Sequence, residues 1–222
     1  MTDRDLIENW ERRLDLIDDD VVQSLLVRRY VFREVQEIVE RNPRIQKPSI
    51  FFDWMASGYV ASAVMAVRRH VDPDTDAVSL ITLLREIRKR PDLLSRERHV
   101  ERYREEGGAE FEEVGHREFD RFAGQGGSHV DPRLVRDDIT ALQRLTGDLE
   151  RYATKRVAHL DAKGPDRIPT FDELEKAIDL FEDLVKKYRL LIKREGGDVL
   201  PVVAYPWKAI FTEPWIPPDA KE

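Results

Sequence analysis

The chain has 222 residues, of which 41% are hydrophobic and 36% charged, and its formal net charge is -7. This apolar fraction suffices for a globular core, and the acidic balance gives the whole chain no attraction to nucleic acid or to an anionic membrane. The absence of cysteine excludes disulfides, thiolate catalysis and cysteine zinc sites. We find no signal peptide and no apolar run of the roughly 18 residues that a membrane helix needs, so we expect a cytoplasmic protein without a membrane partner.

Helix-period patterns dominate the N-terminal part of the chain. One face of the first segment carries Leu6, Trp10, Leu14 and Ile17. The run Asp18 to Asp20 predicts a break and a new helix start, because carboxylates suit a first turn. This second helix should end at Asn42-Pro43, since the residue before proline is pushed out of the helical region. The third, from Pro48-Ser49 to Arg69-His70, is apolar almost all round in its middle, so we interpret it as the buried central helix.

A short helix and a charged segment follow. Asp76 or Ser79 should cap a helix that carries Leu80, Leu83, Leu84 and Ile87. Residues 88–122 are densely charged and have few apolar residues at core spacing. We therefore expect an exposed, partly mobile helix here, broken at Gly107-Gly108 and followed by a loop.

Two further helices are predicted in the C-terminal part. Asp131-Pro132 begins the first, whose apolar stripe from Val135 to Tyr152 continues onto Arg156 and His159, and Gly164-Pro165 ends it. Thr170 and Glu173 form a capping box for the second. In the tail, aromatic residues should pin the chain onto the bundle, and the only weak strand pattern is 199–205. The aromatic anchors are Trp207, Phe211 and Trp215.

These patterns predict an all-α fold, a bundle of about five to seven helices in a single domain, 1–222. Its core should comprise about 3–87 and 131–195. The segment of about 88–130 is a charged, partly exposed insertion, and the irregular tail 196–222, rich in proline and aromatic residues, packs on the bundle.

Three segments together resemble one branch of the HEPN superfamily, the AbiU-like abortive-infection branch. They are FFDWMASGYVASAVMAVRRHVDPDTDAVSLITLL, RYATKRVAHLDAKGPDRIPTFDELEKAIDLFEDLV and WKAIFTEPW. The most specific element is Ala158-His159-Leu160-Asp161 with Pro169-Thr170. The resemblance runs from about Ile50 to Trp215 and fits poorly between Arg88 and Gly127.

The resemblance implies a HEPN-type bundle that dimerises through the helices bearing the motif. In active members an Arg and a His, separated by four to six residues, cleave RNA without a metal, and two motifs form one composite site. This chain departs from that pattern, because Tyr152, Ala153 and Thr154 stand where the Arg is expected.

His159 is the best single candidate for chemistry. Imidazole can take a proton from a ribose hydroxyl and return one to a leaving oxygen near neutral pH, while cations stabilise the transition state. Arg156 and Arg151 could supply that charge, with Lys155 as a binding residue and Asp161 as the fourth candidate catalytic residue. Alternatively, His159 packs at the end of the stripe and bonds Asp161 or a carbonyl.

Arg68 and Arg69 form a second candidate binding cluster, at the end of the helix predicted to be central. Two arginines there need carboxylate or phosphate partners, and an ion pair with Asp161 or Asp72 that locks the turn is the preferred interpretation. The sharper hypothesis is that they supply the missing arginine to His159 across the bundle.

Other site types have weak support. The basic residues between Arg85 and Arg104 alternate with glutamates, which favours a solvated, salt-bridged face over a phosphate track. We expect no metal and no cofactor, because the histidines show no ligand spacing. These are His70, His99, His116, His129 and His159.

Three hypotheses remain open from sequence. The first is a HEPN-like protein of a phage-defence or toxin–antitoxin type system, a metal-independent RNase with a degenerate motif. The second is a non-catalytic homodimer that binds RNA or a partner protein such as a cognate antitoxin. The third is a helical scaffold of unrelated function.

Overall fold

The computed structural model describes residues 2–215, and these contain eight α-helices and no strand. The helices are α1 (Asp3–Val21), α2 (Val27–Arg41), α3 (Ile50–Val71), α4 (Leu80–Lys89), α5 (Arg96–Gly107), α6 (Ala109–Ala123), α7 (Pro132–Tyr152) and α8 (Phe171–Tyr188). The all-α prediction is confirmed, with one helix more than the upper expectation. The predicted break at Gly107-Gly108 divides the charged segment into α5 and α6. Residues 216–222 of the predicted tail lie outside the described residues.

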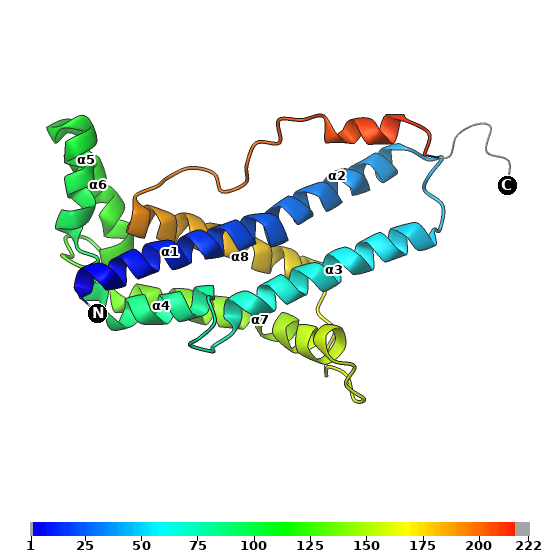
Figure 1. Ribbon diagram of the computed structural model, residues 1–222, viewed down its shortest axis with the longest axis horizontal. Helices are drawn as coiled ribbons and strands as arrows, with labels where there is room; N and C mark the ends of the chain where they lie inside the picture. The colour runs from blue at the N-terminus through cyan, green and yellow to red at the C-terminus, as the bar shows by residue number, and fades with distance from the viewer. Residues whose placement is uncertain (1, 216–222) are drawn as a thin grey trace.

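Figure 1 shows an elongated bundle with α1 and α2 forming one long rod. Helix α3 returns beneath this rod, α8 lies behind it, and α4 and α7 complete the bundle. The pair α5 and α6 stands at one end. At the other end α2 and α3 diverge and project past the remaining helices, and we call residues 32–59 the arm. The tail runs along α2 to the end of the arm.

The predicted break at Asp18 to Asp20 is wrong, because the rod passes through a π-helical segment, Val22–Leu26, without interruption. The aspartates are used in long-range pairs instead of a cap. Asp18 lies 3.4 Å from Arg189 beyond the end of α8, and Asp20 contacts Arg69 and His70 on α3. Spacing along the sequence carries no information on such partners.

The helix ends predicted from other local sequence patterns are confirmed. Ser49, Ser79 and Asp131 are N-caps whose side chains accept backbone N–H groups. The capping box of Thr170 and Glu173 begins α8, and α2 ends at Arg41 before Asn42-Pro43. Each of these signals acts within one helical turn, which is why the sequence alone reveals it.

The interpretation of α3 as a buried central helix holds only for its second half. Tyr59, Ala63, Val64 and Val67 are core residues, whereas Ile50 and Trp54 are 87% and 69% exposed. Among the described helices α3 alone is long and apolar enough to cross a bilayer by length and composition, and 28% of its apolar window is buried. The sequence shows no uninterrupted apolar run of this length, because Asp53 and Ser57 interrupt the apolar residues of this helix.

The charged segment is more than an exposed helix. Helices α5 and α6 form a hairpin around Gly108, whose positive φ of 71° suits glycine. Val100, Phe119 and Phe122 are buried together with His99 and close the end of the core. The segment was expected to be an exposed helix with few apolar residues at core spacing, yet these few are buried, because they meet across the hairpin and not along one helix.

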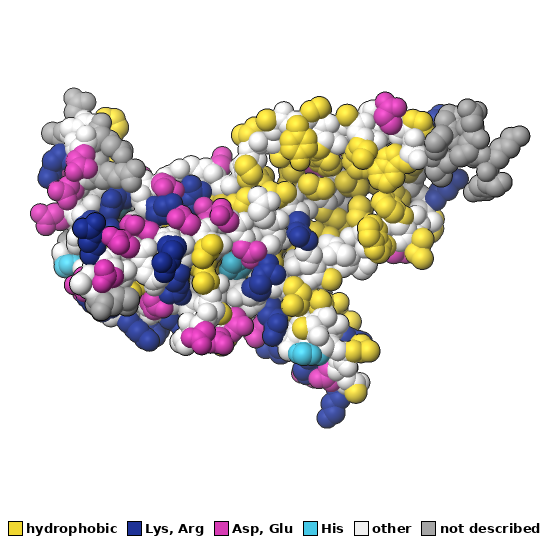
Figure 2. All heavy atoms as spheres, viewed as in Figure 1, with side chains coloured by type: hydrophobic (Ala, Val, Ile, Leu, Met, Phe, Trp, Pro, Cys, Tyr) yellow, Lys and Arg dark blue, Asp and Glu magenta, His cyan; other side chains and the backbone are white. Residues whose placement is uncertain are grey.

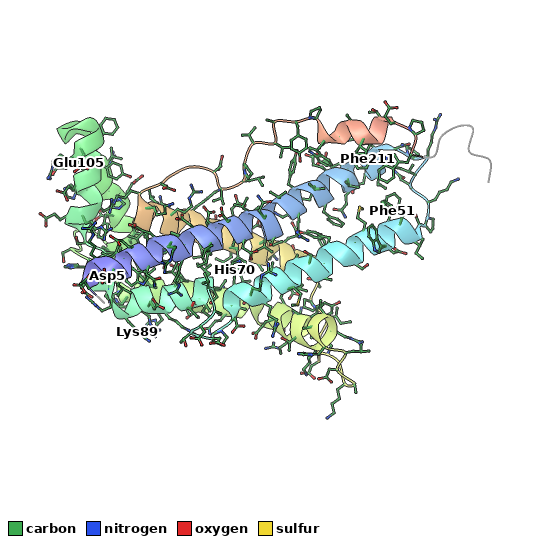
Figure 3. The ribbon with its side chains drawn as sticks, viewed as in Figure 1. Asp5, Phe51, His70, Lys89, Glu105 and Phe211 are labelled. Carbon is green, nitrogen blue, oxygen red and sulfur yellow. The ribbon has the colours of Figure 1, made fainter. Side chains whose placement is uncertain are left out.

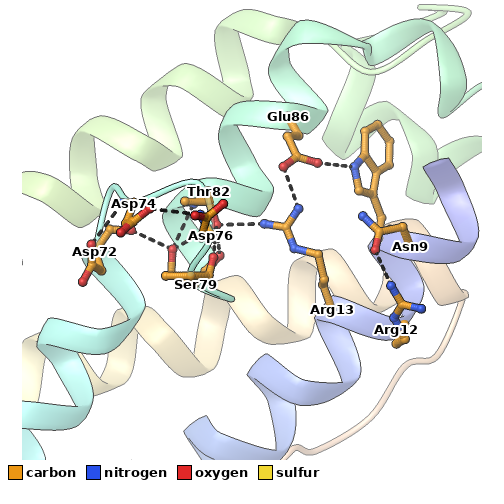
Figure 4. Close-up of polar contacts among 11 residues, drawn as sticks. Asn9, Arg12, Arg13, Asp72, Asp74, Asp76, Ser79, Thr82 and Glu86 are labelled. Carbon is orange, nitrogen blue, oxygen red and sulfur yellow. Dashed lines mark hydrogen bonds and ion pairs between the residues drawn. The ribbon is translucent and has the colours of Figure 1, made fainter. Parts of the chain in front are cut away.

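A polar network ties the first helix to α4 and to the preceding turn (Figure 4). Arg13 binds Glu86 at 2.6 Å and Thr82 at 2.8 Å, while the Trp10 indole N–H donates to Glu86 at 3.0 Å. Ser79 caps α4 and donates to the Asp72 carbonyl at 2.8 Å. Because these side chains are largely buried and paired, they fix the end of α3 relative to α4.

Candidate nucleic-acid interface

The helix that carries the histidine motif ends differently from the sequence prediction. After Tyr152, α7 continues as a π-helical segment, Ala153–Ala158, and His159 lies outside it in extended conformation. The His159 N–H donates to the Thr154 carbonyl at 3.0 Å, and the Asp161 N–H donates to the Lys155 carbonyl at 3.0 Å. The chain therefore leaves the helix before Gly164-Pro165, and His159 does not continue the apolar stripe of α7.

Asp161 organises the turn that follows. Its carboxylate accepts the Lys163 N–H at 2.9 Å and its carbonyl accepts the Gly164 N–H at 3.1 Å. Gly164 is buried with a φ of 67°, and a Cβ at this position would lie 3.6 Å from the guanidinium of Arg156. Asp161 thus shapes the loop beneath Arg156, and no hydrogen bond joins it to His159 among the described residues.

The basic side chains around His159 differ in how they are engaged. Lys155, Arg156 and Lys163 form no ion pair with any side chain that the structure describes, and His159 is exposed in the same segment. Arg151, in contrast, is held by Asp148 one turn back on α7. Residues 155–166 carry these three unpaired cations against the exposed carboxylates of Asp161 and Asp166, so the segment has a small positive surplus on a chain whose net charge is -7.

A second arginine fixes the loop to the bundle. Arg167 binds Asp148 at 2.7 Å and Glu173 at 2.6 Å, so it links α7 to the first turn of α8. The hydrogen bonds from Arg151 and Arg167 hold the pKa of Asp148 below its usual range. Sequence reasoning singled out neither Lys163 nor Arg167, because both belong to the loop and become informative only once its path is known.

The three positions at which the family resemblance implies an arginine have structural roles in this chain. Tyr152 packs partly into the core, Ala153 is fully buried, and the carbonyl of Thr154 holds the backbone of His159. No described hydrogen bond or ion pair joins an arginine to the imidazole within the chain. Apolar side chains border the same segment: Leu160 is 88% exposed and Ile168 69% exposed.

The second candidate cluster forms an ion pair with a different partner from those expected. Arg69 binds Asp20 at 2.9 Å and Ser24 at 3.1 Å, and His70 Nε2 lies 3.0 Å from Asp20 between α3 and α1 (Figure 3). These contacts, the His70 contact foremost, hold the pKa of Asp20 well below its usual range although burial opposes them.

The expected carboxylates are engaged elsewhere. Asp72 accepts the Asp74 N–H at 3.0 Å, and Asp161 shapes its own loop. Arg68 is half-buried on α3, and no described hydrogen bond or ion pair connects Arg68 or Arg69 to His159. Within one chain this cluster therefore joins α3 to α1 and supplies no arginine to the imidazole.

The charged segment from Arg85 onwards has the salt-bridged character that its alternating charges favoured. Arg90 pairs with Asp3 and Asp92, while Arg96 pairs with Asp120. Arg98 and Arg104 pair with Glu11 and Glu112. No group of three metal-ligating side chains gathers in the part of the chain that the structure describes.

A large cleft in the described part of the chain holds none of the predicted site residues. It lies between α2 and α3 in the arm and has a volume of about 520 Å³. Its walls include Phe32, Val39, Ile45, Phe52 and Met55. The histidine segment and this cleft are therefore separate features of the molecule.

The fold is an all-α bundle of the HEPN kind, the class that the sequence resemblance implied. A family model for HEPN AbiU2 matches residues 7–141, more than half of the chain, and the protein belongs to that family. It is accordingly an abortive-infection-related HEPN protein. The match includes the first of the three resembling segments and ends before His159. No curated protein and no solved structure matches the chain significantly.

Proposed function

We propose that this protein acts in a phage-defence or toxin–antitoxin type system as a homodimer that binds RNA at the end of α7 and cleaves it without a metal. The observation that carries the proposal is the exposed His159 beside the unpaired Lys155, Arg156 and Lys163. Hydrogen bonds from His159 and Asp161 to the π-helical segment hold these residues on a defined backbone.

The arrangement of basic side chains would first bind the phosphates of the RNA, and His159 would then act on the bound strand. Lys155, Arg156 and Lys163 can contact successive phosphates, since single-stranded RNA binds through its backbone and such binding weakens as salt increases. His159 would accept the proton of a ribose 2′-hydroxyl, whose oxygen then attacks the adjacent phosphorus. The 5′-oxygen leaves with a proton from the imidazolium of the second motif, so protons balance across the dimer.

A homodimer would bring a second histidine motif to the site. Leu160 and Ile168 expose apolar surface on either side of the loop, and such surface is stabilised by burial against a partner. Two copies joined here would place both His159 segments near each other. A protein partner such as an antitoxin could cover the same surface and block it.

A second candidate function, RNA binding without turnover, is favoured by one specific observation. The three positions permitted for the family's arginine hold Tyr152, Ala153 and Thr154, and Arg151 is engaged by Asp148. A site with cations for binding but no arginine beside the imidazole would retain RNA and release it unchanged.

The deciding experiment compares wild type with His159→Ala on mixed RNA in excess EDTA. We expect wild type to cleave, and the variant to lose on the order of a hundredfold or more in rate. The matched control is His129→Ala, which removes another exposed histidine, on the loop before α7, and should retain full activity. Equal cleavage by all three proteins would contradict the role of His159.

A binding measurement separates the two candidates. Lys155→Gln with Lys163→Gln should weaken RNA binding and reduce its salt dependence, whereas Arg88→Gln with Lys89→Gln, an equal charge change on α4, should not. Binding with no cleavage by wild type would establish the second candidate. Absence of both binding and cleavage would reject both.

A further inference from the structure

A small pocket adjoins the π-helical segment, between the end of α7, the middle of α3 and the loop that leads into α8. Its volume is about 130 Å³. Apolar and aromatic side chains line most of it, among them Val60, Val64, Leu149, Tyr152, Phe171 and Leu174. Figure 2 shows hydrophobic atoms next to Lys and Arg side chains where the end of α7 projects from the bundle. The pocket is therefore separate from the cleft in the arm.

Neighbouring ion pairs hold the walls of the pocket in place. Arg167 binds Asp148 on α7 at 2.7 Å and Glu173 on α8 at 2.6 Å. Each of these three residues directly adjoins a wall residue in the sequence. The end of the loop is thus tied to two helices. A pocket that is formed before its ligand arrives loses little affinity to the ordering of its own side chains.

One side of the pocket opens to solvent. Val64 and Leu149 are fully buried at its floor, whereas Ile168 and Phe171 are exposed and mark the opening. Tyr152 adds a hydroxyl that makes no hydrogen bond with any described residue. A phenolic hydroxyl can donate or accept, so it can serve a polar edge of a ligand whose body is apolar.

The size of the pocket suits one six-membered ring. A cavity of about 150 Å³ in a protein core takes up benzene, and a pyrimidine base is a ring of similar size. A purine has a second, fused ring, part of which would remain outside the apolar walls. Proteins bind unstacked RNA bases by packing them on aromatic side chains and by hydrogen bonds to their edges. Tyr152 and Phe171 provide aromatic rings of this kind.

Unpaired charges of both signs lie near the pocket. The two cations Lys155 and Arg156 are within one turn of Tyr152. Two exposed carboxylates without a described ion pair, Glu150 and Asp166, equal them in number. Charge alone would therefore hold an RNA backbone weakly here. A base in the apolar pocket would add affinity and would bring its own phosphate within reach of the guanidinium one turn further along the helix.

We propose that this pocket binds one pyrimidine base of the RNA, with the ring against Tyr152 and Phe171 and the attached phosphate at Arg156. The assignment rests on the proposed function, because the base belongs to a strand bound at the end of α7. Phosphate contacts position a nucleic acid but carry no information on its sequence. The pocket would supply that information and fix the register of the strand relative to His159.

The first test compares RNA hexamers that differ only in their bases. All proteins carry His159→Ala so that the hexamers stay intact, and fluorescence anisotropy measures the dissociation constants. Oligouridylate and oligocytidylate should bind roughly tenfold more tightly than oligoadenylate and than an abasic hexamer with the same backbone. Uridine monophosphate should compete poorly with them. Equal competition would identify a free nucleotide as the ligand and overturn the assignment to RNA.

A matched pair of variants assigns the preference to the pocket. Val60→Phe adds a ring to the α3 wall and should reduce the binding of pyrimidine hexamers to the level of the abasic hexamer. Val22→Phe makes the same change at another half-buried position that packs against the core, and should keep the preference. Circular dichroism checks that both variants fold. The ranking of the hexamers on the chain without these changes decides the question if Val60→Phe does not fold.

The outcomes separate this inference from the proposed function. Equal, salt-dependent binding of pyrimidine and abasic hexamers, weakened by Lys155→Gln with Lys163→Gln, would overturn the base pocket and leave the RNA site in place. Binding of no hexamer would reject the RNA site and the pocket together. A dimer that Val60→Phe dissociates, with hexamer binding unchanged, would also overturn the proposal, because the pocket would then be part of a contact between copies.

Discussion

Replacement of His99 by phenylalanine should remove a defined part of the pH dependence of stability. The imidazole is 2% exposed at the base of the α5–α6 hairpin and is surrounded by the rings of Tyr103, Phe119 and Phe122 at centroid distances of 5.4–6.0 Å. Neither ring nitrogen has a well-aligned hydrogen bond among the described atoms. Protonation would therefore place a charge in an apolar site.

Burial lowers the pKa of His99 from 6.5 to about 4. The nearby Arg194 and Arg96 lower the pKa further, whereas Glu118, with an oxygen 3.8 Å from Nε2, opposes the shift. In the unfolded chain the same imidazole titrates near 6.5, so the unfolded state takes up a proton first as pH falls. The stabilisation is complete above pH 6.5 and is lost as the pH falls towards 4.

The magnitude follows from the two pKa values. Between about pH 7.5 and pH 5, the unfolded state gains roughly 2 kcal/mol relative to the folded state through this one group. Carboxylates whose pKa is lowered by pairing, such as Asp20, destabilise the fold mainly at lower pH, nearer their unfolded value of about 4. Above pH 5, the difference between wild type and a variant without His99 therefore isolates the contribution of this one group.

Urea unfolding followed by circular dichroism at several pH values measures this directly. Wild type should lose about 2 kcal/mol more unfolding free energy than His99→Phe between pH 7.5 and pH 5, whatever the stability of the variant at neutral pH. His129→Phe, at an exposed position, serves as the control and should follow wild type. Parallel curves for wild type and His99→Phe would refute the account of His99 as a buried neutral group.

Three further predictions concern stability and assembly. Gly164→Ala should lower the unfolding free energy by about 1 kcal/mol, because the backbone at this position has a positive φ of 67°, while no atom blocks the added Cβ. An unchanged free energy in urea unfolding would show that the loop does not hold this backbone conformation. Ser79→Ala removes the cap of α4 and the bond to Asp72, so thermal unfolding should reveal a loss of about 1–2 kcal/mol. Ile168→Asp should raise the dissociation constant of the proposed dimer at least about tenfold in sedimentation experiments. Val202→Asp, at an exposed position on the tail, should leave the dissociation constant unchanged. Equal effects of the two variants would place the interface elsewhere.

The sequence predicted those parts of the fold whose cause is local. The helix starts at Ser79, Asp131 and Thr170 follow from side chains that accept amides within the same turn. The apolar stripe of α7 identified Val135, Ile139, Leu142 and Leu149 as core residues. In each case the residues that make the interaction are at most a few positions apart or repeat with the helical period.

Features with non-local causes could not be predicted in this way. The aspartates after Ile17 resemble a helix start, yet their partners lie on α3 and beyond the end of α8. The exposure of Ile50 and Trp54 depends on how far α3 projects beyond α8 and α7, and no periodicity reports that distance. The buried cluster around His99 exists only because α5 folds back onto α6 at Gly108.

The candidate site illustrates the same division. Sequence spacing selected His159, Arg156 and Lys155, and the structure places all three at one helix end. It could not show that Arg151 is held by Asp148, or that Asp161 closes a turn and does not contact the imidazole. The π-helical segment is the cause of the largest error, because one extra residue in the turn moves His159 off the face that an α-helix would give it.

The backbone geometry of the π-helical segment also indicates at which position an arginine could be introduced. The His159 N–H donates to the Thr154 carbonyl, five residues earlier, so Thr154 lies one π-helical turn before the backbone of His159. Its side chain is half-buried, whereas Ala153 is fully buried and cannot accept an arginine without disrupting the core. Thr154→Arg places the cation at the spacing the family resemblance implies, and should increase RNA cleavage in EDTA on the order of a hundredfold. The double variant Thr154→Arg with His159→Ala must then be inactive. If Thr154→Arg folds, binds RNA and still does not cleave it, the site is a binding surface and His159 has no part in turnover.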